Sequence, residues 1–236
     1  MTKKSYFEVS VVASRWLWAG LGLVMIGSLL TLWGETFTAV SSGMAGAVGN
    51  ALTALMQSGV VRSLLALVMG AGWLLLLDHF RRGMRRVGDR FWMAVALWEV
   101  LVAVAAVVSA IPTGGGTYAY AHTPGAWDAF RQTFLLNEQV VSGCIQLLVL
   151  CVCVVRYRGR ILCYGLLGMI CPLLSGYVQA LLYGWSTGDG TPVVGFLLWG
   201  YALRLLLTWV PVVMLRRTMS TRIDVQPAEA DGDVAR

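Results

Sequence analysis

Two ionisable residues stand inside long apolar stretches of the chain, where a charge has no water to solvate it. Glu99 lies in AVALWEVLVAVAAVV, and Arg204 lies in LLWGYALRLLLTWV. A charged side chain in hydrocarbon costs several kcal/mol, so such residues are usually paired and often belong to sites that handle ions, protons or polar solutes. Glu99 and Arg204 are therefore the first candidates for function.

The two charges are expected at similar depths. At 1.5 Å per residue, Glu99 lies about 12 Å above the inner boundary of its run and Arg204 about 16 Å from either boundary of its own. We predict that they pair inside a helical bundle and border a small polar cavity that is also lined by Gln146, Gln179 and Thr208. A buried pair that only fixes helix packing is the alternative. Without a nearby cation, desolvation would keep Glu99 protonated and make it a proton carrier.

Small residues beside both charges predict that these side chains face neighbouring helices. Glu99 falls in a stripe of alanines at spacings of three and four, and Arg204 shares a helix face with Gly200 and Pro211. Small residues mark the places where membrane helices approach closely. Pro172, in another apolar run, leaves a carbonyl that polar groups or water must satisfy.

Composition places these residues in a membrane protein. Of 236 residues, 58% are hydrophobic and 13% are charged, whereas soluble domains carry about 25% charged residues. The apolar residues form runs near the roughly 20 residues that cross a bilayer, without the polar faces that a soluble helical core would need. We predict an all-α membrane protein, a bundle of six transmembrane helices. The expected spans are 15–34, 63–79, 91–111, 140–155, 161–183 and 193–215.

Basic residues cluster at every second connection between these runs. The clusters precede the first run and then occupy 81–90, 156–160 and 216–222. This positive-inside pattern places both termini on the cytoplasmic side of the cell (inner) membrane. The net charge of +6 therefore indicates contact with the lipid bilayer and its anionic headgroups, and we expect no nucleic acid partner.

Three segments are expected outside the spans. Residues 36–57 have helical periodicity and predict an amphipathic helix at the outer interface; a re-entrant or spanning segment is the alternative. Residues 123–137 predict a second interfacial helix, with Trp127 on its aromatic face beside Phe130 and Phe134. Residues 220–236 are acidic and polar, which predicts a disordered cytoplasmic tail after a single membrane domain, 1–219.

Two further groups of residues invite a functional interpretation. His122, Trp127 and Asp128 lie in an outer connection that can form an aromatic ligand-binding loop, although interfacial anchoring explains the same residues. Asp78 and His79 lie at the inner end of the second span, beside arginines. We interpret them as a salt-bridged helix end.

Several kinds of chemistry are excluded or unsupported. The only two histidines, His79 and His122, are expected on opposite sides of the membrane, which excludes a bis-histidine haem or a multi-histidine metal site. No phosphate-binding loop, zinc-protease or serine-hydrolase motif occurs. We expect no catalytic residue, metal or cofactor. A cysteine transferase that uses Cys144, Arg204 and His122 stays open.

Three functions are compatible with this pattern. The first is a small transport or solute-binding membrane subunit with a polar site near the membrane midplane. The second is a structural or assembly subunit of a larger membrane complex, with the small residues Gly20, Gly27 and Gly34 as a helix-packing stripe. The third is an intramembrane enzyme that uses Glu99, Arg204 or a cysteine. The expected partners are accordingly a small solute or other membrane subunits.

Overall fold

The computed structural model of the chain describes residues 4–44, 58–111, 126–186 and 194–221. Within them six helices are long and apolar enough to cross a membrane, which confirms the predicted number of apolar helices for the described part. The elements in chain order are β1 (Phe7–Glu8), α1 (Val11–Met44), α3 (Gly59–Arg86), α4 (Trp92–Ala110), α5 (Ala126–Arg156), α6 (Gly159–Ser186), α7 (Val194–Arg217) and β2 (Met219–Ser220).

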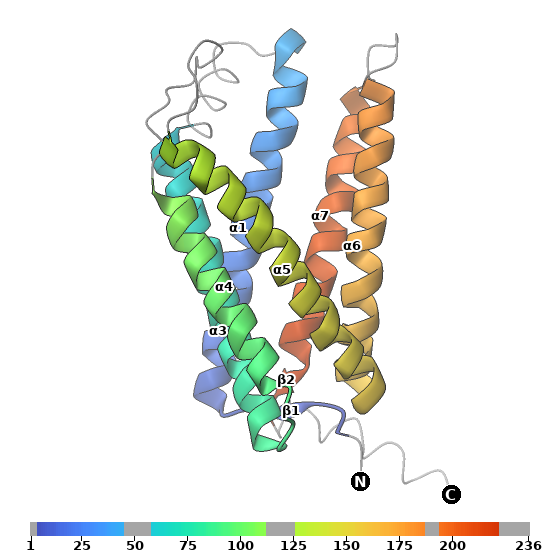
Figure 1. The fold of residues 1–236 in the computed structure, drawn as a ribbon. Helices are drawn as coiled ribbons and strands as arrows, with labels where there is room; N and C mark the ends of the chain where they lie inside the picture. The colour runs from blue at the N-terminus through green and yellow to red at the C-terminus, as the bar shows by residue number, and fades with distance from the viewer. Residues whose placement is uncertain (1–3, 45–57, 112–125, 187–193, 222–236) are drawn as a thin grey trace, which may run out of the picture.

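The helices form a closed ring (Figure 1). Each helix packs against the next described helix in the chain, and α1 also packs against α7. Short connections favour this order, because consecutive elements usually become neighbours. The ring places α4 and α7 on opposite sides, with α5 and α6 between them on one side and α3 and α1 on the other.

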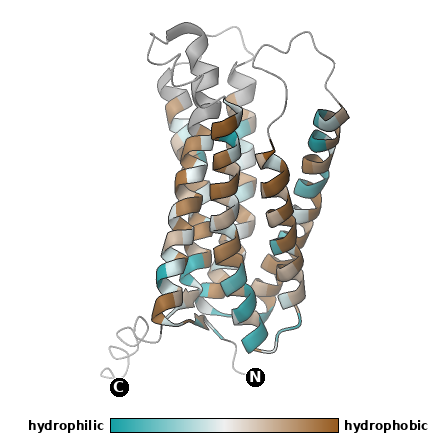
Figure 2. Cartoon of the chain, turned by 90° about the vertical axis from the view of Figure 1, so that its left-hand side faces the viewer, coloured by the Kyte–Doolittle hydropathy of each residue, from teal (hydrophilic) through white to brown (hydrophobic). Residues whose placement is uncertain are grey.

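The strands β1 and β2 lie together at one end of the bundle, which we call the basal end (Figure 1). They pair in parallel, with Phe7 opposite Met219 and Glu8 opposite Ser220. The connections 87–91 and 157–158 also lie at this end. Figure 2 shows that hydrophilic residues gather there, whereas the helix surfaces above are mainly hydrophobic.

α1 and α5 exceed their expected spans by the most. α1 continues ten residues past Gly34 to Met44, and α5 runs unbroken from Ala126 to Arg156. The described part of the predicted interfacial helix, 126–137, therefore shares one helix with the span 140–155. The 31 residues of α5 rise about 46 Å, more than the roughly 30 Å of hydrocarbon. α5 crosses the bundle obliquely (Figure 1), as long spans do in a membrane. Residues 45–57 and 222–236, which hold most of two predicted segments, lie outside the described residues.

The buried core lies toward the basal end. Its members on the helices all come from the basal half of their own helix, from Leu17 to Val24 on α1 and from Leu76 to Met84 on α3. Phe7 and Met219, from the two strands, complete the core. The helices are therefore joined most firmly where the strands cross beneath them.

Glycines allow α1 and α3 to approach closely. A Cβ added to Gly72 would lie 2.7 Å from the Gly20 carbonyl oxygen and 2.8 Å from a methyl of Val24. A Cβ added to Gly27 would meet the Met69 side chain. Two glycines of the stripe expected to serve a partner subunit, Gly20 and Gly27, thus face α3 of the same chain.

Replacement of Gly72 by alanine should lower the melting temperature of the protein in detergent. Overpacking costs about 1–3 kcal/mol, which outweighs the roughly 1 kcal/mol by which alanine favours a helix. The matched control is Gly22→Ala, because a Cβ at Gly22 meets no atom within 4 Å, and this variant should melt at a higher temperature. Thermal unfolding followed by circular dichroism measures both, and shifts of the same sign would contradict the close contact.

Candidate functional site

The structure does not join Glu99 to Arg204, so the predicted pair is wrong. The Oε2 of Glu99 lies 2.7 Å from the Nε of Arg81 on α3, and Arg204 donates to the amide oxygen of Gln179 on α6 at 3.4 Å. The reason is the order of the ring, because α4 and α7 lie on opposite sides of it. Similar depth in a membrane does not make two helices neighbours.

Glu99 belongs to a network of four charges at the α3–α4 interface. Arg81 lies 2.6 Å from Asp78 and Arg82 lies 2.7 Å from the other oxygen of Asp78. The Arg81 Nε–H does not point at Glu99 closely enough for a hydrogen bond, so charge attraction accounts for that contact. The network of two acids and two arginines has a formal net charge of zero. The salt-bridged helix end expected at Asp78 is confirmed, and the Nδ1 of His79 contacts a carbonyl one turn earlier on α3.

The pairing of Arg81 with Glu99 could have been predicted from their positions in the chain. Asp89 lies at the centre of the α3–α4 connection, with Arg81 eight residues before it and Glu99 ten residues after it. In an antiparallel helix pair, residues at similar distances from the turn lie at similar depth. Because Arg81 carries a long side chain, its guanidinium also reaches along the helix toward the apolar region.

Three of the predicted polar residues meet on α6 and α7. Arg204 is half-buried and contacts Gln179, which is exposed. The hydroxyl of Thr208 donates to the carbonyl oxygen of Arg204 at 2.9 Å. Gln146 is half-buried on α5, and within the described part of the chain no hydrogen bond joins it to this group. The predicted cavity with all five residues is therefore not formed.

The outer candidates are described only in part. His122 lies outside the described residues. Trp127 is exposed, and its ring lies 5.5 Å from that of Phe130, which lies 6.1 Å from that of Phe134; these contacts confirm the predicted aromatic face. The Oδ1 of Asp128 has no hydrogen-bond partner among the described residues. The ligand-binding loop stays a prediction.

Among the residues whose burial the structure describes, the best-enclosed carboxylate is Asp89, which the sequence analysis did not single out. Its side chain is 6% exposed. It accepts from Arg156 at 2.7 Å, from the Tyr157 hydroxyl at 2.7 Å and from the Phe91 backbone N–H at 3.1 Å. Burial and the hydrogen bond to Asp89 raise the pKa of Tyr157, so its hydroxyl stays protonated and keeps donating. Asp89 thus joins two connections, and its position as a lone acid within RRGMRRVGDR was the available clue.

Residues 4–10 form a strap that crosses the basal end before α1 begins. On one side, the Phe7 N–H donates to the Thr218 carbonyl at 2.7 Å; on the other, the Ile161 N–H donates to the Ser5 carbonyl at 3.2 Å. The strap therefore bridges α7 and α6 through its backbone.

The side chain of Phe7 anchors the strap in the core. Its ring makes edge contacts with Phe80 at 5.4 Å and with Tyr157 at 5.6 Å. A Cβ added to Gly83 would lie 2.6 Å from the Phe7 ring, so only glycine leaves room for it on α3. Gly159 lies close to Ser5. Its φ of +56° belongs to a backbone conformation that glycine adopts without strain.

Several arginines of the basic clusters act as cross-links at this end. Arg216 is buried, donates to Ser14 of α1 at 2.6 Å and to the Met219 carbonyl, and lies 4.8 Å from the Trp18 ring. Arg160 of α6 donates to the Ser220 hydroxyl at 2.7 Å. These arginines therefore hold the fold together in addition to their expected role in orientation.

The described residues hold no cluster of metal-ligating side chains. No three His, Cys, Asp or Glu side chains among them gather as metal ligands. Cys144 is a free, exposed thiol on α5, and its suggested partner His122 lies outside the described part. No family model, curated protein or solved structure matches the chain.

Double-mutant cycles should separate the observed pair from the predicted one. For Arg81→Met and Glu99→Gln, we expect a coupling of about 0.5–3 kcal/mol, the range for residues in contact. For Arg204→Met and Glu99→Gln, we expect additive effects, because these residues lie across the ring. Chemical unfolding in mixed micelles measures the free energies. Additivity in the first cycle together with coupling in the second would show that the observed pairing is wrong.

Loss of the Asp89 carboxylate should destabilise the basal end strongly. Asp89→Ala leaves the buried Tyr157 hydroxyl without its acceptor, which costs about 1–3 kcal/mol, and it also removes the acceptor of the Phe91 N–H. The Arg156 side chain is 52% exposed, so water replaces its lost partner at little cost. Tyr157→Phe removes one neutral donor and should cost about 1–2 kcal/mol. Arg90→Gln, an exposed change in the same connection, is the control. Equal stability of Asp89→Ala and Arg90→Gln in thermal melts would contradict the role of Asp89.

Proposed function

We propose that the chain is a structural subunit of a larger membrane complex, embedded in the cell (inner) membrane with its basal end in the cytoplasm. The observation that carries this proposal is the distribution of polar side chains. In the described helices, Glu99, Arg131, Arg204 and Trp209 each contact a neighbouring helix of the ring and do not converge on a shared hollow.

The contacts follow the ring from interface to interface. Arg81 and Glu99 join α3 to α4. Arg131 of α5 donates to a carbonyl at the end of α4 at 2.8 Å. Arg204 joins α7 to α6, and Trp209 of α7 donates to a hydroxyl on α1 at 2.8 Å. Transport or catalysis needs polar groups that converge on one site. Polar groups that are distributed over separate helix–helix interfaces instead fix the positions of the helices.

The proposed orientation follows from charge. The arginines of 81–90, 156–160 and 216–217 all lie at or near the basal end, where the helices α3, α5 and α7 end. Lysine and arginine are enriched in cytoplasmic loops. The basal end, with the strap and both described chain ends, is therefore assigned to the cytoplasm.

A second candidate function is the binding of a polar or anionic solute between α6 and α7. The Arg204 guanidinium lies near the middle of α7, and the neighbouring Gln179 amide is exposed. A guanidinium in a span is a functional suspect by default. This site is smaller than the predicted cavity and lacks Glu99.

Gentle solubilisation from native membranes should distinguish the two functions. A structural subunit should appear in native mass spectrometry within a species heavier than the 25.6 kDa chain, with other membrane polypeptides at a fixed ratio. The ratio should survive Gln179→Leu, because this exposed amide lies outside the basal core. A monomer that melts at a higher temperature with a small organic anion, an effect lost in Gln179→Leu, would overturn the structural role and support the solute site.

A further inference from the structure

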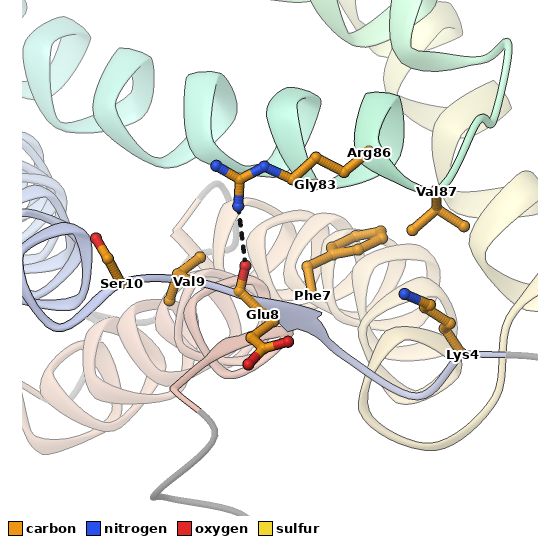
Figure 3. Close-up of a pocket in the computed structure, with 8 residues that line it drawn as sticks. All are labelled: Lys4, Phe7, Glu8, Val9, Ser10, Gly83, Arg86 and Val87. Carbon is orange, nitrogen blue, oxygen red and sulfur yellow. Dashed lines mark hydrogen bonds between the residues drawn. The ribbon is translucent and has the colours of Figure 1, made fainter.

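A groove runs between the strap and the basal end of α3. It consists of two adjoining hollows of about 350 and 130 Å³ that share Glu8, Val9, Ser10, Gly83 and Arg86. Figure 3 shows the larger hollow, with the strap on one side and the last turns of α3 on the other. The groove therefore opens where α3 leaves its apolar region.

The lining of the groove is rich in cationic donors. Lys4, Arg82 and Arg86 line it, and Glu8 is the single acid among its lining residues. Arg86 gives one hydrogen bond, to the Glu8 backbone carbonyl at 3.2 Å, and a guanidinium has five N–H donors. In Figure 3 the Glu8 carboxylate points away from the Arg86 guanidinium. Arg82 is bound to Asp78 but its side chain is 61% exposed.

The polar side chains of Ser10 and His79 also line the groove, and its apolar part comes from Val9, Ala13 and Val87, with the ring of Phe7. Cationic donors beside an apolar floor suit an amphiphile whose anionic group is a phosphate, since guanidinium binds phosphate oxygens with several N–H bonds. We infer that this groove binds the phosphate of an anionic lipid headgroup, with Arg86 and Lys4 as its principal ligands. The apolar floor favours a lipid over free phosphate, which has the same anionic chemistry.

The position of the groove fits this ligand. Other arginines at the basal end lie over tryptophan rings, Arg85 at 5.5 Å from Trp92 and Arg216 at 4.8 Å from Trp18. Tryptophan and arginine gather at the headgroup level of membranes. The inference does not depend on the proposed structural role, because a transporter or an assembly subunit could equally carry such a site.

The full chain in neutral detergent tests the site with three probes: phosphatidylglycerol, phosphatidylcholine and inorganic phosphate. We expect phosphatidylglycerol to bind saturably in native mass spectrometry and to raise the melting temperature, and the other two probes to have no effect. Each of Lys4→Gln and Arg86→Gln should weaken phosphatidylglycerol binding about fivefold, since one basic residue near an anionic surface contributes about 1 kcal/mol.

The matched control is Arg90→Gln, which removes the same charge from the same end of the protein but does not line the groove. It should leave the affinity unchanged. Equal weakening in Arg90→Gln and Arg86→Gln would show diffuse surface attraction and overturn the site. A rise in melting temperature with inorganic phosphate in the absence of lipid would overturn the lipid assignment. The absence of any effect of phosphatidylglycerol would overturn it as well. If Arg86→Gln does not fold, the exposed Lys4→Gln decides the question.

Discussion

The Phe7 ring, buried between Gly83, Phe80 and Tyr157, fixes the N-terminal strap across the basal end. With the ring in place, the strap backbone lies within reach of β2 on one side and of the start of α6 on the other. Without it, these hydrogen bonds would have to order a short, otherwise exposed segment by themselves. The two-stranded pairing and the basal groove both depend on this contact.

The location of that contact has a physical basis. Within lipid, apolar side chains gain little by leaving one hydrocarbon surface for another, so helix association relies on close packing and polar contacts. The strap lies beyond the apolar part of the spans, where hydrophilic residues gather (Figure 2), and burial of an aromatic ring there removes it from water. This difference explains why Phe7 of the strap is buried, at the edge of a core whose helix members lie in the basal halves of the helices. The upper halves are held by isolated contacts such as that of Arg131 with the end of α4.

The sequence allowed the spans to be predicted but not their neighbours. Apolar run lengths follow from bilayer thickness, so the six helices could be predicted, and the arginine clusters marked the basal end. The partner of Glu99 depends on the order of helices around the ring, which hydropathy does not encode. The Arg81–Glu99 pair could have been predicted from the register of the α3–α4 hairpin, and the contact of Asp78 with Arg81 from the i, i+3 spacing within one helix. The strap could not be predicted, because its strand pairing joins segments at opposite ends of the chain and nothing distinguishes Phe7 from Tyr6, the other aromatic residue that precedes the first span.

The parallel pairing of β1 with β2 joins Phe7 to Met219, 212 positions later in the chain. During synthesis the strand partner of the strap therefore does not exist until α7 has been made. Until then the earliest helices can insert into the membrane, but the ring of Phe7 lacks part of its enclosure and the base stays open. The strap therefore cannot pair with β2 before α7 has been made. A chain that stopped before β2 would contain all six described helices but would lack the strand partner of the strap.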